Sequence, residues 1–392
     1  MRYATCLLPW AFATLALSGA VCAEDAVRAR QLGVPFEGTP GPLDAITDVK
    51  GVEVGDTTLI AGDGPLTVGV GPIRTGVTVI FPRGKADSNP VYAGWFTQNG
   101  NGEMTGTTWV EESGFLETPI AITNTDSVGV VRDAMIAWEL KHSSPLAAEG
   151  MLPVVAETWD GYLNDINGFH VKPEDLFNAM DNARGGPVSE GSVGGGTGMI
   201  CYGFKGGDGT ASRVLNKEDG GYTVGVLVQC NCGRRPQLTI AGVPVGKEIP
   251  QDAPYGMFHD GKGGDIEGDL GSIIIVIATD APLLPDQLKR LARRATMGLA
   301  RTGSTSGNGS GDIFIAFSTA NPHAWNESPS PHTVETVSND RISPLFNATV
   351  EATEEAIINA LVAGKTMTGI DGHTVIGLPQ GELQKAMKKY AR

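Results

Sequence analysis

The stretch GSIIIVIAT, residues 271–279, decides the fold of this chain. Residues 273–277 are all apolar and β-branched, and such side chains favour a strand. A strand that carries apolar residues on both faces is covered on both sides. The stretch therefore predicts a central strand in a sheet that lies between two other layers.

Helical and strand-like segments surround this strand. A helix is predicted to open at Pro285, where proline suits the first turn, and a longer one follows Ser343-Pro344 and stops at Gly364. Separate runs of strands and helices, with no Pro-rich linker, indicate one compact α+β unit of stacked sheets sandwiched by helices. The other predictions are helices over 129–142 and 173–180, a loop over 303–311, and strands over 52–60, 68–81, 119–125, 154–156, 221–229 and 313–318.

The composition restricts the class of partner. The 392 residues contain 29 Lys and Arg against 44 Asp and Glu, which gives a net charge of −15. An acidic surface repels phosphate backbones, so we expect no nucleic acid partner. Beyond the N-terminal segment no apolar run reaches the length of a membrane span, so we expect no membrane association once that segment is removed.

Residues 1–23 have the features of a secretory signal peptide. Arg2 supplies the positive charge, residues 7–17 are mostly apolar, and Val21-Cys22-Ala23 offers small residues to a signal peptidase. The segment predicts export to the periplasm or outside the cell. The alternative is an uncleaved N-terminal helix that is buried in the fold.

The cysteines predict no disulfide. Cys6 and Cys22 leave with the signal, so Cys201, Cys230 and Cys232 remain. Cys230 and Cys232 lie on one face of a strand end, too far apart along it for an easy bridge. The odd number favours buried, reduced thiols in spite of the oxidising compartment.

Metal chemistry and common hydrolase motifs are not indicated. The chain has neither a Gly-x-Ser-x-Gly elbow nor a His-Glu-x-x-His helix. Its histidines are scattered without metal-ligand spacing, and they are His142, His170, His259, His323, His332 and His373. The sequence therefore predicts no metal site.

The pair Gly271-Ser272 is a candidate site of self-cleavage. The preceding residues 259–268 are rich in glycine and acids, which is typical of a loop entering a strand. Gly271 lacks a Cβ, so its carbonyl is open to attack by the Ser272 hydroxyl. Cleavage would give Ser272 an α-amine of pKa about 7.7–8.0, which can accept the hydroxyl proton. From spacing alone, an ordinary turn serine is the alternative.

Longer stretches carry a more specific signal. They are LGVPFEGTPGPLDAITDV (32–49), GVEVG (51–55), GEMTG (102–106), ITNT (122–125), ETWDG (157–161), GGGTGMIC (194–201), GVPVG (242–246), ATDAPL (278–283) and SGNGSGDIF (306–314). Together with Gly271-Ser272, they resemble the self-processing serine aminopeptidases, which include the L-aminopeptidase/D-esterases and the β-peptidyl aminopeptidases. The resemblance runs from about residue 30 to the C-terminus.

The resemblance implies an architecture and an assembly. The fold would be a four-layer αββα sandwich, shared with self-processing ornithine acetyltransferases and similar to N-terminal nucleophile hydrolases. Cleavage would give a large chain, 24–271, and a small chain, 272–392, which together form one compact domain. The expected assembly is a homotetramer of such heterodimers, without a cofactor.

The resemblance also implies catalytic roles. Ser272 would be the nucleophile and the first residue of the small chain. Ser310 and Asp312 match a Ser-Gly-acid motif that orients the Ser272 hydroxyl and amine. Asn231 matches an asparagine whose amide donates to the oxyanion. The alternatives from residue type alone are turn serines, a strand-capping Asp312 and a turn asparagine.

Two further residues are implied to contact substrate. Glu157 matches a carboxylate that receives the substrate's free ammonium, although pairing with a basic side chain such as Arg234 is the alternative. Trp159 stands where some aminopeptidases carry Tyr, and an indole donates at a different reach. We therefore expect Trp159 to line the substrate pocket, which favours the β-peptidyl branch.

The predicted function is an exported aminopeptidase that takes N-terminal residues, with β-amino acids preferred, from small peptides, amides and esters with a free N-terminal amine. The acyl group would pass through an ester on Ser272. Three alternatives stay open: an L-aminopeptidase/D-amidase-esterase, an N-acyltransferase of the ornithine acetyltransferase kind, and an uncut, non-catalytic periplasmic binding protein.

Overall fold

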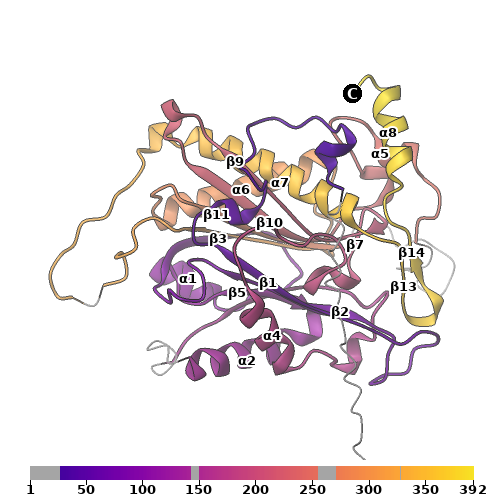
Figure 1. The fold of residues 1–392 in the computed structure, drawn as a ribbon, viewed down its shortest axis with the longest axis horizontal. Helices are drawn as coiled ribbons and strands as arrows, with labels where there is room; N and C mark the ends of the chain where they lie inside the picture. The colour runs from indigo at the N-terminus through magenta and orange to yellow at the C-terminus, as the bar shows by residue number, and fades with distance from the viewer. Residues whose placement is uncertain (1–26, 143–149, 255–270, 327) are drawn as a thin grey trace, which may run out of the picture.

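Two stacked β-sheets lie between two layers of helices in the computed structural model, which describes residues 27–142, 150–254, 271–326 and 328–392. Figure 1 shows the four layers. Helices α2 (Val128–Lys141) and α4 (Pro173–Asn182) cover one sheet, and α6 (Pro285–Arg301) and α7 (Ser343–Ala363) cover the other. The predicted αββα sandwich is confirmed, and both long C-terminal helices begin with the prolines that predicted them.

The larger sheet contains six strands in the order β4-β3-β12-β11-β10-β9. Strands β11 and β12 are parallel, and the other neighbours are antiparallel. The central strand β11 contains the apolar, β-branched run 273–277. The bounds are Val91–Gly100 for β3, Phe115–Leu116 for β4, Gly207–Val214 for β9, Thr223–Asn231 for β10, Ser272–Thr279 for β11 and Gly311–Ser318 for β12.

The smaller sheet contains four strands in the order β1-β2-β5-β6. Strands β5 and β6 are parallel and the other two pairs are antiparallel. The bounds are Glu53–Ala61 for β1, Ile73–Phe81 for β2, Ile120–Asn124 for β5 and Val154–Thr158 for β6.

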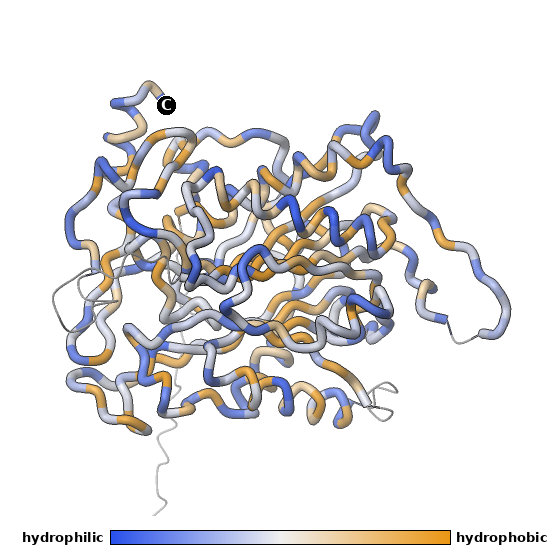
Figure 2. Tube along the Cα trace, turned by 180° about the vertical axis from the view of Figure 1, so that it is seen from behind, coloured by the Kyte–Doolittle hydropathy of each residue, from blue (hydrophilic) through white to orange (hydrophobic). Residues whose placement is uncertain are grey.

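Strand β11 is covered on both faces. Ile273, Ile275 and Ile277 pack in the core beneath α6 and α7. Ile274 and Val276 pack in the core between the two sheets. Figure 2 shows hydrophobic residues concentrated along the central strands and hydrophilic ones on the outer turns. The unbroken β-branched run is explained by this position, because each face of the strand needs apolar side chains.

Short elements complete the fold, and three sequence predictions differ from it. Strand β2 begins at Ile73 and not at residue 68, because Val70 and Gly71 donate to the Thr67 carbonyl in a turn. Strands β3 and β9 were missed because glycines and polar residues interrupt their apolar pattern. The short elements are α1 (Thr107–Ser113), β7 (Ile200–Cys201), β8 (Phe204–Lys205), α5 (Val245–Glu248), β13 (Met367–Thr368), β14 (Thr374–Val375) and α8 (Gln380–Lys389).

The N-terminal segment and the residues before Gly271 are not part of the described fold. The predicted signal peptide, 1–23, and the residues 255–270 lie outside the described residues. Among the helices of the described ranges, none is long and apolar enough to cross a membrane.

Candidate active site

One edge of the larger sheet brings together the ends of its three central strands. Asn231 is the last residue of β10 and pairs with Ser272, the first residue of β11. Ile273 pairs in turn with Asp312 at the start of β12. Because β10 runs antiparallel to the other two strands, its end lies beside their beginnings. Three of the predicted site residues therefore lie on adjacent strands.

Ser272 is buried, and a backbone amide holds its hydroxyl group. The N–H of Gly311 donates to Ser272 Oγ over 3.0 Å. Gly311 lies between Ser310 and Asp312, so the Ser-Gly-acid motif reaches the candidate nucleophile through its middle residue. This contact was not predicted, since glycine offers only its backbone and carries no side-chain signal.

Ser310 and Asp312 form a buried pair beside Ser272. The Ser310 hydroxyl lies 3.1 Å from Asp312 Oδ2 and 2.9 Å from the Gly307 carbonyl, either of which can accept its proton. Asn99, near the end of β3, donates through Nδ2 to the Ser310 carbonyl over 2.7 Å. Asn99 is a positioning residue that sequence reasoning missed. The sequence signal that could have pointed to Asn99 is the run NGNG at 99–102.

The Asn231 amide is held on both sides. The N–H of Ile200 donates to Oδ1 over 2.7 Å, and Nδ2 donates to the Trp159 carbonyl over 3.0 Å. A backbone N–H can only donate and a carbonyl can only accept, so these contacts determine which amide atom is oxygen. An amide nitrogen carries two hydrogens, and the Trp159 carbonyl uses one.

Glu157 lies near the end of β6 and is 4% exposed. Its Oε1 accepts from the Glu103 N–H over 2.9 Å and its Oε2 accepts from the Thr125 hydroxyl. Burial is the main cause that raises the pKa of Glu157 above its ordinary value, and these two bonds partly oppose it. The two carboxylate oxygens are thus held by Glu103 and Thr125, and not by Arg234, which was the alternative.

Close packing connects Glu157 to the nucleophile. A Cβ added to Gly102 would lie 3.3 Å from Glu157 Oε1 and 3.0 Å from Gly311 Cα. The Glu157 carboxylate and the Gly311 backbone therefore flank Gly102, and Gly311 binds Ser272. A Cβ on Gly271 would lie 2.4 Å from the Asn231 carbonyl. Both glycines are explained by the close approach of two backbones.

Trp159 follows β6 and lies beside Asn231. Its carbonyl accepts from the Asn231 amide, and its indole lies within 2.6 Å of a Cβ position on Gly161. The ring packs against a small apolar cluster that includes Leu163 and Ile200. Trp159 thus contacts the candidate oxyanion donor through its backbone, and its role in lining the substrate pocket stays a prediction.

The prediction of fully reduced cysteines is wrong for two of them. Cys201 on β7 and Cys230 on β10 form a disulfide, with Cα atoms 5.8 Å apart. The fold brings β7 against the end of β10, a contact across 29 residues that spacing in the sequence does not reveal. Cys230 and Cys232 do not bridge each other, as predicted, and Cys232 is a buried thiol. Among the described residues these cysteines are the group close enough to share a metal ion, and the disulfide uses two of the three.

A buried lysine supports the segment behind Asn231. Lys205 on β8 donates through Nζ to the carbonyls of Met199 and Gly206 over 2.8 and 2.9 Å. Burial lowers the pKa of Lys205 to about 7. The bond to Met199 fixes the peptide group that precedes Ile200, whose N–H holds Asn231.

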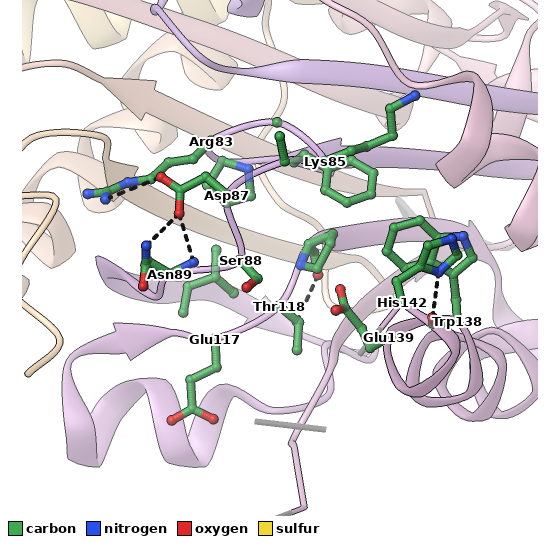
Figure 3. A pocket seen from close by; sticks show the side chains of 16 residues that line it. Arg83, Lys85, Asp87, Ser88, Asn89, Glu117, Thr118, Trp138, Glu139 and His142 are labelled. Atoms are coloured by element: carbon green, nitrogen blue, oxygen red, sulfur yellow. Dashed lines mark hydrogen bonds and ion pairs between the residues drawn. The ribbon is translucent and has the colours of Figure 1, made fainter. Parts of the chain in front are cut away.

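A separate pocket lies at the opposite end of the sheets (Figure 3). Pro119, one of its lining residues, precedes β5, whereas Thr125 at the Glu157 site follows that strand. Arg83 lies within 3.9 Å of Asp87 there and donates to the Thr319 carbonyl, beyond the far end of β12. The pocket's lining includes none of the predicted site residues.

Comparisons with known proteins agree with this geometry. The model of peptidase family S58 matches residues 44–375. The β-peptidyl aminopeptidase BapA of Sphingosinicella microcystinivorans is 55% identical over 389 residues, which cover 98% of this chain and 97% of that protein.

Two solved structures share the fold over nearly their whole length. The L-aminopeptidase D-Ala-esterase/amidase of Ochrobactrum anthropi, described as a variant of the Ntn hydrolase fold, is 46% identical with a TM-score of 0.85 and covers 93% of this chain and 99% of its own. A β-aminopeptidase of Burkholderia sp. is 48% identical with a TM-score of 0.81 and the same two coverages. The family model and these relatives span most of the chain, and the protein therefore belongs to peptidase family S58.

Proposed function

We propose that this peptidase activates itself by cleavage between Gly271 and Ser272 and then releases N-terminal β-amino acids from small peptides, amides and esters. The convergence of Ser272 and Asn231 at one edge of the larger sheet with Glu157 from the end of β6 in the smaller sheet carries the proposal. These residues supply a nucleophile, an amide donor and a buried carboxylate. The relative that is 55% identical is named a β-peptidyl aminopeptidase, which supports the substrate class.

Maturation would be an intramolecular acyl transfer. Ser272 Oγ attacks the Gly271 carbonyl carbon, the peptide nitrogen takes the hydroxyl proton, and the C–N bond breaks to leave an ester. This step frees the Ser272 α-amine, and water then hydrolyses the ester, which releases the Gly271 carboxylate and restores the Ser272 hydroxyl. The close approach of Gly271 to the Asn231 carbonyl supports a constrained backbone at the scissile bond.

Turnover would repeat this chemistry on a substrate. The Ser272 amine accepts the hydroxyl proton as Oγ attacks the substrate carbonyl, and the proton then passes to the leaving amine. The second hydrogen on Asn231 Nδ2 would stabilise the oxyanion. Ser310 and Asp312 would orient the hydroxyl and the amine of Ser272, and their buried pairing next to the Gly311 amide supports this role.

Glu157 would select substrates with a free N-terminus. A buried carboxylate that approaches an ammonium ion gives a strong charge-assisted bond. Because Glu157 is held by Glu103 and Thr125, it would set the distance from the ammonium to the carbonyl under attack. A β-amino acid places one more methylene in this interval than an α-amino acid, and Trp159 would line the same pocket.

A second candidate is an L-aminopeptidase with D-amidase and D-esterase activity. The Ochrobactrum anthropi structure bears such a name and is 46% identical to this chain. An N-acyltransferase and an uncut binding protein are less supported, because the relatives named above are aminopeptidases.

Export and assembly are parts of the same proposal. Residues 1–23 would direct the chain to the periplasm or the medium, and the mature heterodimers would associate as a tetramer. N-terminal sequencing of secreted protein and light scattering of the purified enzyme would test these two statements. An N-terminus at Met1, or a monomeric mass, would contradict them.

The central experiment combines mass spectrometry with matched substrates. Purified protein should contain two chains that meet at Gly271 and Ser272, and it should release β-alanine from its p-nitroanilide faster than L-alanine. A strong preference for L-alanine would support the L-aminopeptidase instead. A chain that stays uncut and inactive after long incubation would rule out both enzymes.

A further inference from the structure

Three consecutive cross-links join β7 and the residue after it to the end of β10 and the residue after it. The Ile200 N–H donates to Asn231 Oδ1 over 2.7 Å, Cys201 is bonded to Cys230, and the Tyr202 N–H donates to the Cys232 carbonyl over 2.6 Å. The disulfide is the covalent member of this set. It lies directly between the two hydrogen bonds along β7.

The sulfur atoms lie behind Asn231. Side chains alternate along a strand, so Cys230 and Asn231 face opposite sides of the sheet. Cys201, Cys230 and Cys232 all belong to the core beneath α6 and α7 and are at most 1% exposed. The disulfide therefore does not touch substrate and would act on Asn231 only through the backbone.

We propose that the Cys201–Cys230 disulfide is a redox-sensitive positioning device for the Asn231 amide. The bond keeps β7 against β10, so that the Ile200 N–H holds Oδ1 while Nδ2 donates to the Trp159 carbonyl, and Asn231 itself pairs with Ser272 across the strands. Reduction by a dithiol breaks the S–S bond, gives two thiols and oxidises the reagent to its cyclic disulfide. The inference rests on the proposed role of Asn231 as oxyanion donor.

Loss of the disulfide should slow acyl transfer and therefore lower kcat. Loss of a whole oxyanion donor costs about 10²–10³ in kcat, and a small displacement costs less. We expect loss of the disulfide to lower kcat about tenfold. KM should stay within about twofold, because the ammonium contact at Glu157 lies on another strand.

The first test compares two variants of the full chain. In Cys201→Ala/Cys230→Ala the disulfide is gone, and Cys232→Ala removes an equally buried sulfur and leaves the disulfide in place. The double variant should show the loss in kcat on the β-alanyl amide, and Cys232→Ala should match the wild type. Equal rates for all three proteins, or equal loss in both variants, would overturn the proposal.

A double-mutant cycle shows whether the effect passes through Asn231. In the Asn231→Ala background, loss of the disulfide should change kcat little further, because the donor is already absent. An undiminished tenfold loss in that background would overturn the positioning role. If Asn231→Ala alone is fully active, Asn231 is not the oxyanion donor, and this part of the proposed function is wrong. Peptide mapping shows separately whether Cys201 and Cys230 are bonded.

Reduction of the mature wild-type enzyme covers the case in which the double variant does not fold or mature. Dithiothreitol is added under native conditions and one aliquot is assayed; in a second aliquot the thiols are alkylated with N-ethylmaleimide in denaturant near neutral pH, and peptides containing Cys201 and Cys230 are weighed. Activity should fall in step with alkylation of these cysteines and return on reoxidation. Alkylated cysteines with full activity, cysteines already alkylated before reduction, or a bond that resists reduction in the folded enzyme would each contradict the proposal.

Discussion

At the scale of the residue, Ser272 differs from other buried serines by its position. Ser318 is buried too but lies at the C-terminal end of β12, where its hydroxyl donates to the Ala281 carbonyl. Ser272 accepts from the Gly311 amide and follows Gly271, whose carbonyl is the proposed site of attack. The difference in role thus comes from the ends of the strands and not from burial.

Ser272→Ala should abolish both cleavage of the chain and turnover, because the variant lacks the attacking oxygen. Mass spectrometry and release of p-nitroaniline measure the two effects. Ser318→Ala is the matched control and should mature normally. Residual processing in Ser272→Ala would contradict the proposed mechanism.

Glu157 should make substrate binding depend on pH. Burial raises its pKa above 4.5, so the carboxylate that binds the ammonium is lost at a higher pH than for an exposed glutamate. We expect KM to rise as the pH falls through this raised pKa. Glu157→Gln should have a higher KM that stays flat over the same range. A wild-type KM that is flat, or the same slope in both proteins, would contradict the ammonium site.

At the scale of the element, the parallel pairing of β11 and β12 puts Ser272 and Asp312 at the same end of the sheet. The antiparallel β10 brings its end to the same edge, and β3 adds Asn99 from the other side. The approach is so close that glycine is required at Gly311: a Cβ there would lie 2.4 Å from the Asn101 carbonyl and 2.7 Å from Gly102 Cα.

Gly311→Ala should therefore move the start of β12 and draw its N–H away from Ser272. We expect slower maturation and a kcat reduced about tenfold or more, since misplacement of this size is costly. Gly381→Ala in α8, where a Cβ meets nothing within 4 Å, is the control. It should be neutral or slightly stabilising. A Gly311→Ala enzyme that matures and turns over at the wild-type rate would show that the amide contact is dispensable.

At the scale of the whole molecule, buried ionisable groups between the layers make stability depend on pH. Burial raises the pKa of Asp160 from 3.8 to about 7, and bonds from Thr75, Asn164 and Asn124 oppose the shift. The folded state then keeps a proton that the unfolded state loses between these values. The contribution of Asp160 to stability is full below pH 3.8 and is lost as the pH rises through about 7.

Asp160→Asn should remove this dependence. Relative to the wild type, the variant should gain up to about 1.4 kcal/mol in free energy of unfolding per pH unit within the window, and the gain should level off above it. Urea unfolding at several pH values measures the difference. Asp133→Asn, at an exposed side chain, is the control. An unchanging difference between Asp160→Asn and the wild type would contradict the raised pKa.

Much of the fold was predictable because its signals are local. The helices opened by Pro285 and by Ser343-Pro344 were predicted from proline and apolar spacing, and both were confirmed. Strand β9 was missed because its polar residues become buried only through distant partners: Thr210 donates to the Val226 carbonyl and Arg213 pairs with Glu355. No short stretch of sequence contains those partners.

The sequence by itself determined the central strand, the family resemblance and the identity of the predicted site residues, because β-branched runs and long motifs are properties of neighbouring residues. Only the tertiary structure decided that Gly311 holds Ser272, that Ile200 holds Asn231 and that Cys201 bonds Cys230. Each of these contacts joins segments that are far apart along the chain. Their physical origin is the pairing of β10, β11 and β12 in the larger sheet and the packing of β7 against β10, which set distances that composition and spacing do not encode.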